Sequence, residues 1–497
     1  MILKRLATIL VFTSLFVAAA DSRAELRLHA LFGDNMVLQQ GTTVPVWGWA
    51  DDAEVVTVQF LGQKVSTKAK GGAWTLKLRH LKAGGPDTLT VSTKTETIQL
   101  TNVLVGDVWV CSGQSNMEWL LSKASEPQAD IAAAANPNIQ LFTVPKLKAV
   151  SPTNDVGSDW KECGPQTVSN FSAVAYYFGR DLQKARRVPV GLIHTSWGGS
   201  PAEAWMSDAV LRANPRYQKE IIESYETARR QYEEARAAWE AGDRTGRRPG
   251  APRWKPSELY NGMIAPLIPV AIKGAIWYQG ESNVNRAEQY RALFADLIRN
   301  WRRDWHAGNF AFLCVQLAPY RAIKPEPGDS AWAELREAQL LATKTLPGVG
   351  MAVITDVGDE KDIHPRKKEP VGARLALAAR HVAYGERIVY SGPIFRKMTV
   401  KDGRAILHFK HVGSGLEARD GELKGFAICG ADRKFVWAKA EILSKDTIAV
   451  SSPEVPAPVA VRYGWADCPV VNLWNKNGLP ASPFCTDNFP LTTAAQR

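Results

Sequence analysis

The sequence predicts an α/β fold: a three-layer α/β/α domain built on a parallel sheet, with a β-rich domain before it and another after it. Apolar strand-like runs alternate with amphipathic helical segments over residues 101–385, which is typical of a parallel sheet covered on both faces. Short runs rich in Val, Thr and Trp precede that region, and similar short runs follow it. A chain of 497 residues is long enough for several hydrophobic cores.

Residues 1–24 are expected to be a signal peptide. A basic pair at residues 4–5 precedes an apolar stretch over residues 6–20, and residues 22–24 (SRA) fit the small-x-small pattern of a cleavage site. We therefore expect a mature chain that begins at Glu25 and is secreted or periplasmic. No later segment offers about 18 consecutive apolar residues, so we expect no membrane-spanning helix.

Residues 25–100 are expected to form an N-terminal β-sandwich-like domain, because runs such as "TTVPVWGWA" and "DTLTVSTKT" are separated by Gly, Pro and Asp. Residues 386–497, with runs such as "RAILHFKHV" and "VAVRYGW", are expected to form a C-terminal β-rich domain. Between them, residues 209–256 interrupt the alternation with a charged helix and a loop rich in Pro, Gly and Arg. Opposite charges at helical spacing indicate a solvated insertion, with a lid or partner surface as the alternative.

Charge and cysteine content exclude some classes of protein. The formal net charge is +11, which favours anionic glycans or surfaces, but no basic block interleaved with aromatic residues matches a nucleic-acid module. We therefore expect no nucleic-acid partner. The six cysteines are too scattered for a disulfide scaffold and show no zinc spacing. Cys468 and Cys485, close together in the C-terminal region, are the pair we expect to bridge.

Four loops that each follow an apolar run carry the candidate chemistry: "SGQSNME" (112–118), "HTSWGGSPAEAW" (194–205), "YQGESN" (278–283) and "DVGDEKDIHP" (356–365). In parallel α/β sheets, functional groups gather at the carboxyl ends of the strands. Acyl transfer by serine needs a nucleophile, a base and N–H donors for the oxyanion. The four loops together offer all three.

Ser115 is the candidate nucleophile, because a serine between a strand and a helix N-terminus can present its hydroxyl there. Taken alone, the same position is better explained as a helix N-cap, and Met117 breaks the G-x-S-x-G elbow of α/β-hydrolases. His364 is the candidate base, since imidazole titrates near neutral pH. His194 is a competitor whose place beside a glycine-rich turn better suits local hydrogen bonding.

Two further loops offer donors and orienting groups. The pair Gly198-Gly199 allows close backbone approach, so a Gly199 amide can serve the oxyanion, although a tight turn would explain the glycines too. The "QGESN" loop places two amides, a flexible backbone and a carboxylate within five residues; they either serve the site or satisfy buried backbone groups of the loop. The members of this loop that we single out are Gln279, Gly280, Glu281 and Asn283.

Six ordered strings in this chain resemble the SGNH (GDSL-like) hydrolase superfamily, and more closely the sialate O-acetylesterase group of carbohydrate esterases. They are "FGDNMVLQQ", "GQSNMEW", "SWGGSPAEAW", "WYQGESN", "IHPRKK" and "NLWNKNGLPASPF", and they extend over nearly the whole mature chain. The resemblance implies an SGNH-hydrolase domain that removes acetyl groups from sugars, with an O-acetylated sugar or glycan as substrate and without a metal or organic cofactor.

The resemblance also implies residue roles: Ser115 as the nucleophile, His364 as general base and acid, and the amides of Ser115 and Gly199 with the Gln279 side chain as oxyanion donors. Many members have asparagine in the third block, so whether Gln279 or Asn283 donates stays open. The usual aspartate three residues before the histidine is Lys361 here. Asp362, two residues before, is the expected third member; Asp359 and a Ser-His dyad are the alternatives.

Two other functions fit parts of the sequence. An esterase acting on acetylated plant polysaccharide such as xylan would use the same loops. A non-catalytic carbohydrate-binding protein would suit two β-rich domains and 17 tryptophans, which stack on sugars. The complete set of serine, histidine and donors favours an enzyme.

Overall fold

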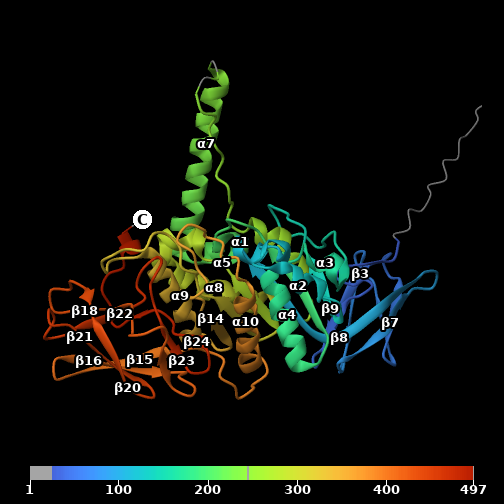
Figure 1. Cartoon of the computed structure of the whole chain (residues 1–497). Helices are drawn as coiled ribbons and strands as arrows, with labels where there is room; N and C mark the ends of the chain where they lie inside the picture. Colours follow the sequence, from blue (N-terminus) through green and yellow to red (C-terminus); the bar gives the residue numbers. More distant parts are fainter. Residues whose placement is uncertain (1–24, 243, 245, 496–497) are drawn as a thin grey trace, which may run out of the picture.

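The computed structural model describes residues 25–242, 244 and 246–495, so the expected signal peptide lies outside the described residues. Three parts follow one another along the molecule: a β-rich end formed by the first strands, a central region of sheet and helices, and a second β-rich end (Figure 1). The predicted α/β fold class with flanking β-rich regions is confirmed. Within the described part of the chain, no helix is both long and apolar enough to cross a membrane.

The central sheet has the strand order β10-β9-β11-β8-β12-β13-β14. All neighbours in this order are parallel except β10 and β9, which are antiparallel. Every residue of β11, β12, β13 and β14 is buried, which explains why these strands are continuous apolar runs in the sequence. The bounds are β8 Thr97–Gly113, β9 Asn136–Thr143, β10 Trp160–Cys163, β11 Val190–Ser196, β12 Gly274–Tyr278, β13 Ala311–Val315 and β14 Val349–Ala352.

Helices cover both faces of this sheet. Helices α4 (Ala173–Arg186) and α10 (Glu369–Val382) pack together on one face, and α8 (Ala287–Trp305) and α9 (Ala331–Thr345) pack on the other. Successive strand residues point to opposite faces. In β8, Trp109 and Cys111 therefore belong to the core beneath α4 and α10, whereas Val108 and Val110 belong to the core beneath α8.

Strand β8 connects the N-terminal β region to the central sheet. Its first half pairs with β7 and its middle with β2, while its second half pairs with β11 and β12. The boundary that we predicted between residues 100 and 101 therefore falls inside one continuous strand. The remaining strands of this region are β1 Arg27–Leu28, β2 Val37–Gln39, β3 Val44–Trp49, β4 Val55–Phe60, β5 Gln63–Lys68, β6 Ala73–Leu78 and β7 Gly84–Ser92.

The C-terminal β region contains three small sheets, ordered β15-β16-β21-β20, β17-β23-β24 and β19-β18-β22-β25, around a core of their own. The bounds are β15 Ile394–Lys401, β16 Arg404–Lys410, β17 Leu416–Ala418, β18 Phe426–Cys429, β19 Val436–Trp437, β20 Lys439–Ser444, β21 Thr447–Ser451, β22 Ala460–Tyr463, β23 Leu473–Asn475, β24 Leu479–Pro480 and β25 Phe484–Cys485. The fully buried guanidinium of Arg336 in α9 joins this region to the central domain.

The expected disulfide is wrong, because Cys468 and Cys485 are both free, as are the other four cysteines. Cys485 lies in β25, where its thiol donates to the carbonyl oxygen of Asp487. Cys468 lies in a loop beside Asp467, whose carboxylate is bonded to Ser330. Closeness along the sequence therefore does not make these thiols a pair.

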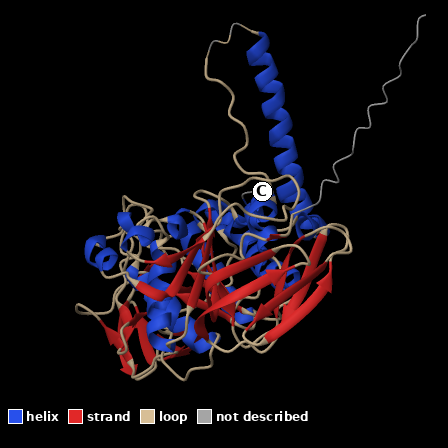
Figure 2. Ribbon diagram, turned by 90° about the vertical axis from the view of Figure 1, so that its right-hand side faces the viewer, coloured by secondary structure: helices blue, strands red, loops and turns tan. Residues whose placement is uncertain are grey.

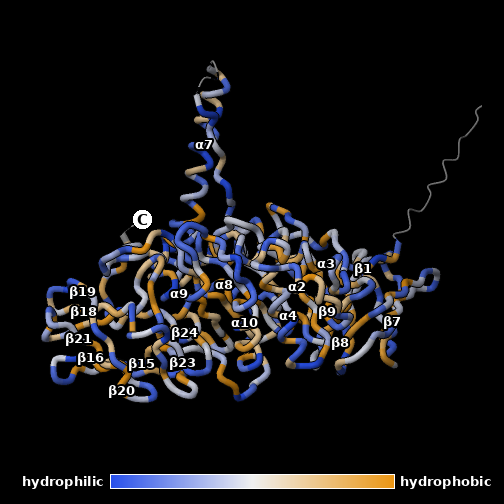
Figure 3. Tube along the Cα trace, in the orientation of Figure 1, coloured by the Kyte–Doolittle hydropathy of each residue, from blue (hydrophilic) through white to orange (hydrophobic). Residues whose placement is uncertain are grey.

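The predicted insertion is helical in its first part, and its helix α7 projects from the body of the molecule before a loop returns (Figures 1 and 2). It contains α5 (Asp208–Ala213), α6 (Pro215–Tyr217), a π-helical turn over Gln218–Glu223 and α7 (Ser224–Ala241). No residue of α7 is buried, and hydrophilic residues dominate along it (Figure 3). Two ion pairs between residues four positions apart, Arg229–Glu233 and Arg236–Glu240, lie on its exposed surface.

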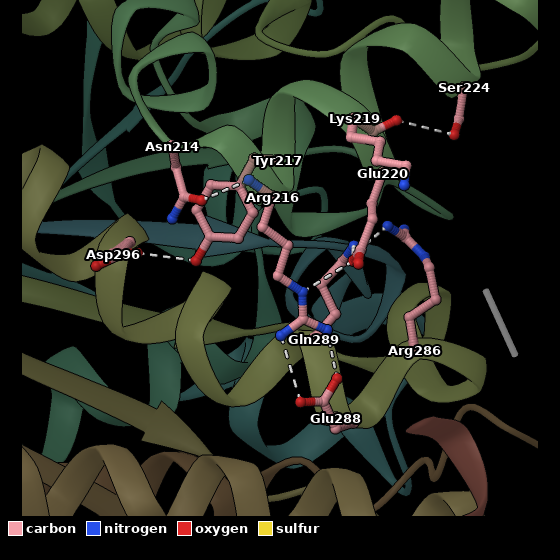
Figure 4. A network of polar contacts seen from close by, with 10 residues as sticks. All are labelled: Asn214, Arg216, Tyr217, Lys219, Glu220, Ser224, Arg286, Glu288, Gln289 and Asp296. Atoms are coloured by element: carbon pink, nitrogen blue, oxygen red, sulfur yellow. Dashed lines mark hydrogen bonds and ion pairs between the residues drawn. The ribbon is translucent and has the colours of Figure 1, made fainter. Parts of the chain in front are cut away.

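A polar network fastens the base of this insertion to α8 (Figure 4). Arg216 bonds to Glu220 within the insertion and to Glu288 at the start of α8. The hydroxyl of Tyr217 donates to Asp296 at 2.8 Å. These contacts order the base of the insertion, while α7 itself extends into solvent.

Candidate active site

The catalytic candidates lie at the carboxyl edge of the central sheet, as expected for a parallel sheet. Ser115 begins the short helix α1 (Ser115–Glu118), directly after β8. The loops that follow β11 and β12 lie beside it, because both strands pair with β8. The loop after β14 brings His364 to the same place. The Nε2 atom of His364 lies 2.9 Å from the Oγ atom of Ser115.

His364 is set up to act as a base. Its ring stacks on Trp119, with ring centroids 5.1 Å apart and an interplanar angle of 20°. Burial lowers the pKa of His364, the nearby Lys368 lowers it further, and Asp362 opposes both effects. The imidazole is therefore neutral at neutral pH, and a neutral ring nitrogen can accept the proton of Ser115.

Asp362 is the carboxylate beside the histidine. Its Oδ1 atom accepts the backbone N–H of His364 at 2.8 Å and lies 3.6 Å from Nδ1 of the ring. Asp359 instead accepts the N–H groups of Lys361 and Asp362, at 2.7 and 3.1 Å, and so shapes the turn. With the two-residue offset, Asp362 lies near the His364 ring, but its closest contact is the hydrogen bond to the backbone N–H of His364.

The Gly198-Gly199 turn lies against the nucleophile. A Cβ atom added at Gly198 would lie 3.3 Å from the Cβ of Ser115, and Gly199 has a φ of +77°, which favours glycine. The Gly198 N–H donates to Glu118 Oε2 at 2.6 Å. Among the described residues, the N–H groups of Ser115 and Gly199 have no acceptor. These two amides are the donors that remain for an oxyanion.

Gln279 and Asn283 bond to each other rather than to Ser115. The Gln279 Nε2 atom donates to Asn283 Oδ1 at 2.7 Å and to the Ser200 carbonyl at 3.3 Å, so both of its N–H groups are engaged. Asn283 accepts the N–H of Ala202 at 2.9 Å and donates to Glu203 at 3.0 Å. Both side chains are buried. In this arrangement they fix the turn that carries Gly199.

A buried polar chain links the serine turn to the histidine loop. Asn116 donates to Glu281 Oε1 at 2.6 Å and to the carbonyl of Ile363 at 3.1 Å, and its own oxygen accepts from Lys368 Nζ at 2.6 Å. Burial raises the pKa of Glu281 and lowers that of Lys368 to about 7. Glu281 accepts a hydrogen bond from Asn116 and so helps to orient that side chain. The Gly280 N–H donates to Gln114 Oε1 at 3.3 Å, which fastens this loop to the serine turn.

Three residues of the site were missed by sequence reasoning: Asn116, Glu118 and Lys368. Asn116 and Glu118 lie in the string "GQSNMEW" around Ser115, so their closeness to the candidate nucleophile could have identified them. Lys368 is 1% exposed, but in the sequence it belongs to "HPRKK", a basic run that is usually solvated. The competitor His194 is buried and its Nε2 atom lies 2.6 Å from Ser196 Oγ. Burial lowers its pKa to about 4, so its role is local hydrogen bonding.

No group of three or more His, Cys, Asp or Glu side chains with the arrangement of a metal site occurs within residues 25–242 and 246–495. The residues that the structure brings together can offer nucleophilic attack by Ser115, proton transfer by His364 and hydrogen bonding to an oxyanion.

Comparison with known proteins finds a matching family model, curated relatives and a related crystal structure. A family model described as "Carbohydrate esterase, sialic acid-specific acetylesterase" matches residues 105–244 and 246–380. The chain is 30% identical to sialate O-acetylesterase of Homo sapiens, over 93% of this chain and 94% of that protein, and 30% identical to the Mus musculus protein over 92% and 94%. A crystal structure of a carbohydrate acetylesterase from Xanthomonas citri is 41% identical, with a TM-score of 0.83, over 94% of this chain and 100% of that one.

Proposed function

Because this chain belongs to the sialic acid-specific acetylesterase family of carbohydrate esterases, we propose that it hydrolyses acetyl esters on sugar hydroxyls through an acetyl-enzyme on Ser115. The observation that carries the proposal is the 2.9 Å contact between Ser115 Oγ and His364 Nε2. A nucleophile within hydrogen-bond reach of a base is the geometric requirement for this chemistry.

The reaction has two halves. In the first, Ser115 Oγ attacks the acetyl carbonyl while its proton passes to His364 Nε2, and the N–H groups of Ser115 and Gly199 stabilise the oxyanion. The C–O bond to the sugar then breaks, and His364 returns the proton to the departing sugar oxygen. In the second half, water attacks the acetyl-serine with His364 as base. Acetate leaves and Ser115 regains its proton.

The first candidate substrate is O-acetylated sialic acid, because the matching family model and the mammalian relatives bear that specificity in their names. The second is another acetylated carbohydrate such as acetylxylan. The observation that favours it is the higher identity, 41%, to a carbohydrate acetylesterase from Xanthomonas citri.

We also propose that the protein is exported, to the periplasm or outside the cell. The basic pair, the apolar stretch and the SRA sequence within residues 1–24 support this proposal. Expression of the full chain, cell fractionation and N-terminal sequencing test it: we expect an exported protein that begins at Glu25. An uncleaved chain found only in the cytosol would contradict it.

The function is tested by following acetate loss by mass spectrometry from 9-O-acetyl sialic acid and from acetylated xylo-oligosaccharides. We expect release from at least one, and a loss of about 10⁵ to 10⁶ in kcat for Ser115→Ala. If glycans bind but acetate is released from neither substrate, the protein is a carbohydrate-binding protein instead.

A further inference from the structure

The insertion returns to the body of the molecule beside the catalytic turn. The ring of Trp254, in the segment that follows α7, lies edge-on to Trp197, with centroids 5.5 Å apart. Lys148 Nζ lies 4.3 Å from the centroid of the Trp254 ring and donates to the Arg253 carbonyl. Trp197 directly precedes Gly198. The returning segment is therefore fastened to the loop that carries the oxyanion donor.

Arg253 lies directly over that loop. Its Nη2 atom donates to the Gly198 carbonyl at 3.1 Å. A Cβ atom added at Gly199 would lie 3.0 Å from Arg253 Nη1. Since Gly198 also packs on Ser115, the guanidinium and the nucleophile contact the same turn. A sugar whose acetyl group is at Ser115 would place its neighbouring substituents within reach of Arg253.

Arg253 has no carboxylate partner among the described residues. Lys146 is paired with Glu118, and Lys148 with Glu258 at 2.8 Å. The side chain of Arg253 is exposed, and it forms no ion pair with a carboxylate in the described ranges. Glu118, which contacts the turn, and Glu258 are thus each paired with a lysine. Arginine presents several N–H groups in a planar fork that matches a carboxylate.

We propose that Arg253 binds a carboxylate on the acetylated sugar, with Trp197 and Trp254 as the apolar surface beside it, so that the preferred substrate class is acidic acetylated sugars. This inference rests on the proposed function, because it concerns the same site. It also assigns a role to the insertion: its returning segment supplies a specificity-determining residue, and α7 itself takes no part in the site.

The test compares two substrates that differ only in charge: 9-O-acetyl sialic acid and its C1 methyl ester, with acetate release as the readout. For the unmodified protein we expect kcat/KM to be about tenfold or more higher for the free carboxylate, as for a charge-assisted hydrogen bond. In Arg253→Gln that ratio falls to about one. In Arg253→Lys, which keeps the charge without the fork, an intermediate ratio is expected.

The matched control is Arg248→Gln, an exposed arginine of the same segment beside Trp239 on the insertion, which leaves the ratio unchanged. The readout is the ratio of the two sugars within each variant, so a general change in acetyl-transfer rate in Arg253→Gln cancels, and a denaturant unfolding curve shows that the variant folds. Equal rates for the two sugars in the unmodified protein would overturn the inference while leaving the proposed function standing. An Arg253→Gln variant that keeps the ratio of the unmodified protein would overturn it too, since the carboxylate would then be bound by another group.

Discussion

The imidazole of His364 is flanked by two charges with opposite effects on its pKa. Lys368 lowers that pKa and Asp362 raises it, while burial, the largest influence, lowers it. Under the proposed mechanism His364 is the base and must be neutral to accept a proton, so we expect activity to fall as the pH drops through a pKa that lies below the ordinary 6.5. In this mechanism, Lys368 and Asp362 tune the acid limit of the activity through the pKa of His364.

Opposite substitutions should move that limit in opposite directions. Lys368→Met removes the cation and should move the acid limb of kcat/KM to higher pH; Asp362→Asn removes the anion and should move it to lower pH. The pH profile of 4-nitrophenyl acetate hydrolysis measures both. Shifts in the same direction would contradict this electrostatic account. Because Asp362 lies 3.6 Å from Nδ1, Asp362→Asn should also cost far less than the roughly 10⁴ in kcat of a directly bonded aspartate.

Gln279 and Asn283 are expected to act through the position of the Gly199 turn. Replacing either with Ala leaves buried partners unsatisfied, so each change should lower the free energy of unfolding by about 1 to 3 kcal/mol as well as the rate. A direct oxyanion donor behaves differently: its loss costs about 10² to 10³ in kcat with little effect on stability. Denaturant unfolding and kinetics on both variants distinguish these roles. If Gln279→Ala had an unaltered unfolding curve and a large loss of kcat, the Gln279 side chain would be a direct donor to the oxyanion.

Sequence reasoning found Ser115 and His364 because each follows an apolar run in a loop of suitable composition. The structure brings these two together, although 249 positions separate them. Sequence reasoning could not find Lys368, because burial of a lysine depends on distant partners such as Asn116 and Glu281. It also left the carboxylate open, since a two-residue offset does not show whether Asp362 faces the ring or the backbone.

The burial pattern changes along the length of strand β8. Up to Asn102 its residues vary in exposure, and from Val103 onward every residue is buried. An exposed face and a fully buried strand have different sequence patterns, so the two halves were assigned to different domains. The strand is continuous because β7 and β2 pair with its N-terminal part, and β11 of the central sheet pairs with the part that follows.

Helix α7 is an element whose removal should cost little. None of its residues is buried, and exposed ion pairs on a helix surface add little to stability. Replacing residues 228–247 with a short Gly-Ser linker should therefore change the free energy of unfolding by less than about 1 kcal/mol. Acetate release from 9-O-acetyl sialic acid should persist, because Arg253 and Trp254 remain. Loss of that release with normal 4-nitrophenyl acetate hydrolysis would show that α7 itself contacts the sugar.

At the scale of the whole molecule, Arg336 connects the central and C-terminal regions. It donates to the carbonyls of Leu317 and Ala318 near the end of β13, and to those of Ala466 and Asp467 in the C-terminal region, at 2.7 to 3.1 Å. The side chain is fully buried. Nothing in the helix pattern of α9 distinguishes this arginine from an exposed one, so the contact between the two regions was beyond sequence reasoning.

Arg336→Met should lower the free energy of unfolding by about 3 to 5 kcal/mol, because it leaves buried carbonyls without donors. Denaturant unfolding measures the change. Arg396→Met, at an exposed position of β15, is the matched control and should stay within about 0.5 kcal/mol of the unmodified protein. Equal stabilities for the two variants would contradict this role for Arg336.

The acetyl-enzyme is the central claim, and rapid-quench mass spectrometry tests it most directly. The protein is mixed with 4-nitrophenyl acetate, quenched in acid and digested. We predict that one acetyl group appears on the peptide that contains Ser115 before steady state, and that the same peptide from Ser115→Ala stays unmodified and releases no acetate above background. Acetate release by Ser115→Ala at the rate of the unmodified protein, with no acetyl group on that peptide, would contradict the account.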